Sequence, residues 1–313
     1  MEQQRNSAID RFRGLAVLMM AVANYLGEVE IVPAWLKHAP DIGFTITDTI
    51  ASIFLFAVGL LYGRSFRKRA GINKSAAYGH FATRYLALIG IGAFLSAGGD
   101  VLAGIHAEWG VLQSIGVAGL FCLAFIQLKP VPRMLAGLAL LTAYQFMLDR
   151  SMLEAVLNTP HGGIFGAISW SAMLIMVSGL GDLKERGLKA YTLGSLAVSA
   201  LAAAAAFLTP ISKNRVSASI ILLTLAISAW LYLAIELLTR NWKTRGALCW
   251  VGENPLGLYV LHMLMLGLLA VPQNPHWYAG APVWLVAVQL TVFLGILIAA
   301  AYLLHRKNIV IKL

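Results

Sequence analysis

The sequence predicts an all-α polytopic membrane protein with about ten transmembrane helices and both termini on the cytoplasmic side. Three observations support this fold class. The chain of 313 residues is 59% hydrophobic and only 12% charged, about half the charged fraction of a soluble domain. Apolar segments of roughly 18 residues or more recur along its whole length. The basic residues gather in alternate loops between these segments.

The apolar segments are too long and too continuous for barrel strands, which alternate over about 10 residues, so helices are the remaining way to cross a bilayer. Ten segments have the length of a transmembrane helix. In chain order they are 14–32, 45–63, 84–103, 109–128, 132–148, 163–181, 189–208, 217–238, 254–271 and 283–304. We interpret the first as a retained span, because a second apolar run follows it at ordinary loop distance. Residues 1–313 are expected to form a single transmembrane domain.

The loop charges predict the orientation of these spans. With a cytoplasmic N-terminus and alternate crossing, 20 of the 24 Lys and Arg residues fall on the cytoplasmic side. The four on the outer side are Lys37, Arg150, Lys213 and Arg215. Basic loops beside anionic lipid then explain the net charge of +10 without a nucleic-acid partner. The two cysteines lie inside apolar segments and predict neither a disulfide framework nor a metal site.

The first span follows Asp10, Arg11 and Arg13, a pattern explained by anchoring at the cytoplasmic side and a local ion pair. Arg13 is also a candidate contact for an anionic cofactor. Asn24 lies within the span, where an amide needs hydrogen-bond partners. It is expected either to join two helices or to orient a substrate or His38.

The stretch "HAPDIGFTITD", residues 38–48, connects the first two spans at the outer side. Pro40 and Gly43 disfavour a helix there. A threonine at its end is a candidate cap for the second span, with Asp48 in the first turn. Two interpretations of His38 stay open. It is a solvated surface histidine beside a cap, or a general base whose imidazole Asp48 orients.

The later spans carry further candidates at the same predicted outer side. Trp109 begins the fourth span as an interfacial aromatic residue or a ligand contact, and Gln113 lies one turn deeper. His161 precedes the sixth span, which contains Trp170. Lys213, Asn214 and Arg215 lie in an outer loop. Its two basic residues depart from the positive-inside rule, so an anionic partner is expected. Before the ninth span, at the cytoplasmic side, Asn254 precedes a proline at the first helical turn.

Walker A, CxxC, HExxH and GxSxG motifs are absent from the sequence, and nothing suggests a bound metal. Several segments, in order, resemble the heparan-α-glucosaminide N-acetyltransferase family of transmembrane acyltransferases, including its bacterial members. They are "IDRFRGLAVLMMAVANYLG", "LKHAPDIGFTITDTIASIFLFAVGLLYGRSF", "WGVLQSIGVAGL", "HGGIFGAISWSAMLIMVSGLGDL", "TPISKNRVSASIILLTLAISAWLY" and "GENPLGLYVLH".

The resemblance implies acetyl transfer from cytosolic acetyl-CoA to a terminal glucosamine amine across the membrane. It places the catalytic histidine at His38, the intramembrane asparagine at Asn24 and the loop aspartate at Asp48. A multi-pass protein of a bacterial inner membrane is therefore expected. The chain has Pro-Asp after His-Ala where the family favours an aromatic residue, and Gln-Ser where relatives often have Gln-Arg, so the acceptor identity stays open.

With this function, the remaining candidates fall into two groups. Cofactor-binding residues are expected to be Arg13, Gln113, Lys213, Asn214 and Asn254, and substrate-binding residues His161, Trp109 and Trp170. His38 is expected to act as a base or as an acetyl carrier. Two alternatives are an O-acyltransferase acting on a surface or lipid-linked glycan and a secondary transporter of a sugar or anion. Transporters commonly show inverted repeats and paired broken helices, which this sequence lacks. The oligomeric state is open, a homodimer included.

Overall fold

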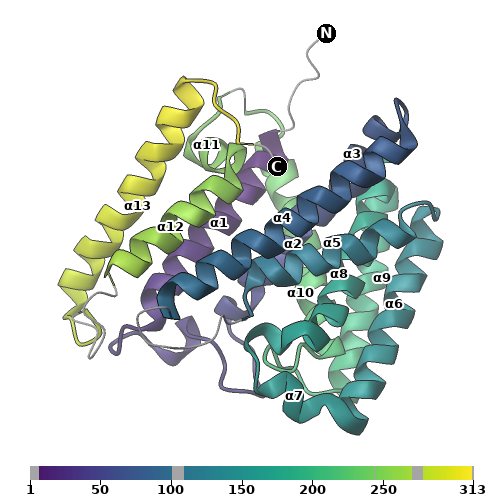
Figure 1. Ribbon diagram of the computed structural model, residues 1–313, viewed down its shortest axis with the longest axis horizontal. Helices are drawn as coiled ribbons and strands as arrows, with labels where there is room; N and C mark the ends of the chain where they lie inside the picture. The colour runs from purple at the N-terminus through teal and green to yellow at the C-terminus, as the bar shows by residue number, and fades with distance from the viewer. Residues whose placement is uncertain (1–6, 101–108, 243, 270–277, 312–313) are drawn as a thin grey trace. The chain divides into compact units, whose positions relative to one another are not determined.

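The computed structural model describes residues 7–100, 109–242, 244–269 and 278–311, and this part of the chain contains helices and no strand (Figure 1). The all-α prediction is therefore confirmed for these residues. The helices are α1 Ser7–Gly27, α2 Ile50–Gly59, α3 Tyr62–Ala70, α4 Lys74–Asp100, α5 Val111–Phe125, α6 Pro130–Met147, α7 Leu153–Leu157, α8 Gly163–Glu185, α9 Leu188–Leu208, α10 Ala218–Thr239, α11 Ala247–Glu253, α12 Pro255–Leu269 and α13 Val283–Arg306. Short helical turns cover Ala34–Leu36, Ile46–Thr49, Leu148–Met152 and Pro160–Gly162.

A helix overlaps each of the ten predicted segments, although residues 101–103 and 270–271 of two segments lie outside the described residues. Six helical stretches of the described chain are long and apolar enough to cross a membrane. They are Ile46–Ala70, Pro130–Leu157, Pro160–Glu185, Leu188–Leu208, Ala218–Thr239 and Val283–Arg306. Two shorter apolar helices are α5 and α12. A multi-pass membrane protein is therefore supported, and the count of ten stays a prediction.

Helix α1 begins at Ser7, earlier than the predicted start at residue 14, because its charged first turns have partners. The Arg11 guanidinium donates to the Thr244 carbonyl at 2.8 Å and lies over the Trp242 ring. Asp10 forms an ion pair with Arg245. These groups are satisfied within the fold, so the helix extends through residues that hydropathy alone excludes from it.

The contacts divide the chain into two compact units. Unit 1 comprises residues 1–38, 45–50 and 230–313, and unit 2 comprises residues 39–44 and 51–229. In unit 1, α1 packs against α11, α12 and α13, and Figure 1 shows α1, α12 and α13 side by side. The α1–α11 backbones touch closely at Gly252, where an added Cβ would meet the Asp10 carbonyl oxygen at 1.7 Å. A small residue is needed for this approach.

In unit 2, α8 is the central helix and packs against α3, α5, α6 and α9. Its residues from Gly166 to Leu183 are buried except Ile168, because the sequence is apolar around most of the helix and not along one stripe. Two of its serines, Ser171 and Ser178, donate to carbonyls of α8 itself, and Ser169 donates to the Val216 carbonyl at 2.7 Å.

Candidate functional site

His38 and Asp48 form a direct pair in unit 1. His38 Nδ1 lies 2.7 Å from Asp48 Oδ1. The Asp48 side chain is fully buried, whereas that of His38 is 47% exposed. The half-exposed imidazole therefore has one ring nitrogen fixed by a buried carboxylate.

The same carboxylate also caps the helical turn at the start of the second predicted span. Asp48 Oδ2 accepts hydrogen bonds from the Thr45 backbone N–H and hydroxyl, both at 3.0 Å. Thr47 donates its hydroxyl to the Leu36 carbonyl at 2.7 Å, which joins the turn 46–49 to the segment just before His38. A carboxylate in the first turn also meets the positive end of the helix. Local capping chemistry thus places the carboxylate beside the histidine.

This geometry selects one form of the imidazole. An ionised carboxylate only accepts hydrogen bonds, so His38 Nδ1 carries the donated proton in the neutral ring. The lone pair then lies on Nε2, the nitrogen away from Asp48. A neutral imidazole held in this tautomer can accept a proton or attack a carbonyl carbon at Nε2. Asp48 therefore both caps the helical turn and contacts His38, and the role of His38 as a base stays a prediction.

A second polar pair of unit 1 joins α1 to α12. Asn24 Nδ2 lies 3.1 Å from His262 Nε2 and donates to it. His262 is fully buried, and Asn24 is exposed. The predicted partner of the Asn24 amide is thereby found. Sequence patterns did not pair these residues, although two polar groups inside apolar spans each require a partner.

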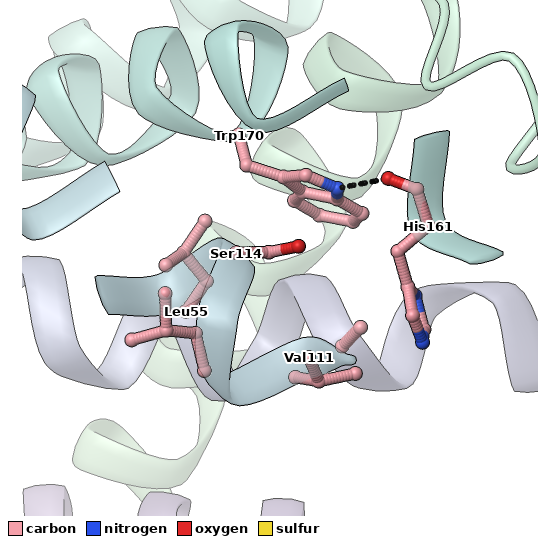
Figure 2. Close-up of a pocket in the computed structure, with 7 residues that line it drawn as sticks. Leu55, Val111, Ser114, His161 and Trp170 are labelled. Atoms are coloured by element: carbon pink, nitrogen blue, oxygen red, sulfur yellow. Dashed lines mark hydrogen bonds between the residues drawn. The ribbon is translucent and has the colours of Figure 1, made fainter. Parts of the chain in front are cut away.

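In unit 2, His161 and Trp170 line a small cavity with Ala51, Leu55, Val111, Ser114 and Ile115 (Figure 2). Trp170 is buried and donates its Nε1–H to the His161 carbonyl at 3.2 Å. Figure 2 shows the Ser114 hydroxyl below the indole. Trp109 donates to that hydroxyl at 2.8 Å. The cavity volume is about 10 Å³, enough for about one water and too small for a sugar.

The backbone at His161 is strained. His161 has φ 54° and ψ 20°, a left-handed conformation that is uncommon outside glycine, and Gly162 and Gly163 also have positive φ. Val216, in the neighbouring loop of unit 2, is a second such residue, with φ 47°. Strain of this kind persists where the surrounding structure fixes it, often at binding sites. His161 and Lys213 also line a surface depression of about 310 Å³.

Arg215, one of the cations in the predicted outer loops, has a partner within unit 2. Arg215 pairs with Asp41 at 2.5 Å, and this guanidinium holds the pKa of the Asp41 carboxyl below its usual value. Asn214 donates to the Pro40 carbonyl. The anionic partner invited by Arg215 is therefore an aspartate of the same chain, and these bonds tie the segment after His38 to residues 211–215.

The other predicted cofactor-binding residues also contact protein groups. Arg13 lies 3.9 Å from the Asp10 carboxylate. The Gln113 carbonyl oxygen accepts the Gly110 N–H at 3.1 Å, at the start of α5. Asn254 holds the C-terminal segment through the Ile309 carbonyl and the Ile311 N–H, at 2.9 and 2.7 Å. Their roles toward a cofactor stay predictions, and the geometry assigns each a structural contact.

Comparisons with known proteins agree with the resemblance. A model of the family "Heparan-alpha-glucosaminide N-acetyltransferase, catalytic" matches residues 5–180. A human heparan-alpha-glucosaminide N-acetyltransferase is 31% identical over 138 residues, which are 41% of this chain and 20% of that protein. The match thus spans a fifth of the human relative's length. Since the family match covers more than half of the chain and includes His38 and Asp48, the chain belongs to the heparan-alpha-glucosaminide N-acetyltransferase catalytic family.

Proposed function

We propose that this protein is a membrane acetyltransferase that transfers an acetyl group from cytosolic acetyl-CoA to the amine of an extracytoplasmic amino sugar. One observation carries the proposal: a half-exposed imidazole, His38, has its Nδ1 fixed by the buried Asp48 carboxylate. Family membership supports the reaction class. The name of the human relative supports a glucosamine-type acceptor.

The chemistry assigned to His38 is proton transfer at Nε2. The amine nitrogen attacks the thioester carbonyl carbon, the carbon–sulfur bond breaks, and CoA leaves as the thiolate. Nε2 accepts the proton that the amine loses and returns it to the sulfur. A positioned base of this kind contributes about 10²–10⁴-fold to the rate. Asp48 stabilises the imidazolium that forms in between.

A two-step route uses the same nitrogen. Nε2 attacks the thioester to give an acetylimidazole, and the amine then takes the acetyl group from the ring. In either route Asn24, held by His262, is proposed as a donor to the oxyanion. The predicted ten spans and cytoplasmic termini place acetyl-CoA beside the basic loops, with His38 on the opposite side.

The test is CoA release by the purified protein with a panel of amino-sugar and hydroxyl acceptors. We expect His38→Ala to lower acceptor-dependent release at least about 100-fold. His80→Ala, which replaces a histidine of α4, is the matched control and is expected to retain wild-type release. Full acetylation by His38→Ala protein contradicts the assignment. Protein-bound radiolabel from labelled acetyl-CoA without acceptor identifies the two-step route, and its absence identifies direct transfer.

A further inference from the structure

A second candidate site lies in unit 2, where α3 and α8 end and α4 and α6 begin. It is an open pocket of about 540 Å³, within the size range of small-molecule sites. We call it the basic pocket. Its lining residues are Phe66, Arg67, Ala70, Lys74, Ile126, Gln127, Leu128, Lys129, Pro130, Arg133, Asp182, Glu185 and Arg186. They come from loops that the charge pattern predicts to be cytoplasmic.

Arg133 is a buried residue of this pocket that holds several of its parts together. It is 2% exposed and donates to the Ile126 and Leu128 carbonyls at 2.8 and 2.6 Å, which fixes the loop between α5 and α6. It also pairs with Asp182 at 3.0 Å, and Asp182 pairs with Arg67 at 2.6 Å. The buried carboxylate is therefore shared by two guanidinium groups. The Nε–H of Arg133 has no acceptor among the described residues.

Three further cations, Lys74, Lys129 and Arg186, line the same pocket. All three side chains are exposed, and no ion pair joins any of them to a carboxylate in the described ranges. The lining holds five Lys or Arg residues and two carboxylates, a net charge of +3. Since Asp182 and Glu185 already pair with Arg67, the charge of the three remaining cations is available to a ligand.

We propose that the basic pocket binds a phosphate group. Lys and Arg side chains are the usual partners of phosphate oxygens, through charge-assisted hydrogen bonds. The apolar wall of Phe66, Ile126 and Leu128 gives the attached body of the ligand a surface to pack on. Basic pockets between membrane helices on the cytoplasmic side also bind anionic lipid head groups. The phosphate belongs to a phospholipid head group or to a soluble phosphate compound, and the proposal does not depend on the acetyltransferase function.

The experiment uses the full chain and one probe for each source. Inorganic pyrophosphate is titrated calorimetrically into detergent-purified protein. Phosphatidylglycerol retention from mixed phosphatidylglycerol–phosphatidylcholine nanodiscs is measured by native mass spectrometry. The pocket variant carries Lys74→Ala, Lys129→Ala and Arg186→Ala. The matched control carries Lys68→Ala, Lys189→Ala and Lys307→Ala, which remove the same charge from exposed positions outside the pocket.

Wild-type and control protein are expected to bind at least one probe, and the pocket variant to bind it about 100-fold more weakly. Pyrophosphate binding identifies a soluble source, and binding of phosphatidylglycerol alone identifies a head group. The proposal is overturned if neither probe binds, or if the pocket variant binds as tightly as the control. Should the triple variant not purify as a folded protein, the three single substitutions replace it, and unchanged binding by all three overturns the proposal.

Discussion

At the scale of the residue, Asp48 does two jobs with one carboxylate. One oxygen accepts from Thr45 and starts a helical turn, and the other holds His38 Nδ1. Folding of the loop and orientation of the imidazole therefore depend on the same buried group. Asparagine has nearly the same shape, but its amide carries a hydrogen-bond donor in place of one oxygen. It can therefore serve only one of these two roles.

Asp48→Asn separates the two roles. An amide oxygen turned toward Thr45 preserves the cap, and the NH2 group then faces His38 and donates to Nδ1. The ring proton moves to Nε2, which no longer accepts a proton, so we expect kcat to fall about 10²–10⁴-fold with little change in KM. The pH profile of kcat is measured alongside. Asp41→Asn, which removes a carboxylate bonded to Arg215, is the control. Unchanged kcat and pH profile in Asp48→Asn contradict the positioning role.

At the scale of the element, sequence patterns predicted features that depend on neighbouring residues and missed contacts between residues far apart in the sequence. His38 and Asp48 are ten residues apart, and capping rules placed Asp48 at the start of the second span. The Asn24–His262 pair spans 238 residues, so no local pattern joins them. Arg133 counted as a cytoplasmic loop charge, yet it is buried at the start of α6, because the Asp182 carboxylate and the Ile126 and Leu128 carbonyls satisfy it. A hydropathy pattern cannot predict that a charged side chain is buried against a partner distant in the sequence.

Helix α3 offers a test of this packing at Gly63. A Cβ added there would meet Asp182 Oδ1 at 2.2 Å, and Asp182 is held between two arginines. We expect Gly63→Ala to destabilise the protein by about 1–3 kcal/mol through overpacking. Thermal unfolding in one detergent measures the change. Gly79→Ala in α4, with no atom within 4 Å of its added Cβ, is the control and is expected to be neutral or slightly stabilising. Equal stability of the two variants would show that the side chains around Asp182 rearrange to accommodate the added Cβ.

At the scale of the whole molecule, the loops that contact one another within each unit are loops that alternate crossing assigns to the same side of the membrane. In unit 2 the segment 39–44 meets residues 211–215 at one end, and the loops of the basic pocket meet at the other. In unit 1 the start of α1 meets Arg245, and Glu253 pairs with His305 near the end of α13. Every group contains loops that the charge pattern assigns to one side. The number of spans and the side of each group stay predictions.

Cysteine labelling of intact bacterial cells with a membrane-impermeant maleimide tests the predicted side. Glu30→Cys and Asn158→Cys are expected to react in intact cells, because both positions are exposed in predicted outer loops. Lys68→Cys and Lys307→Cys, exposed in predicted cytoplasmic segments, are expected to react only after permeabilisation. The wild-type chain, whose Cys122 and Cys249 are buried, gives the background. A reversed pattern places His38 on the same side as cytosolic acetyl-CoA. The acetyl group then needs no path across the membrane, and the proposed extracytoplasmic acceptor is excluded.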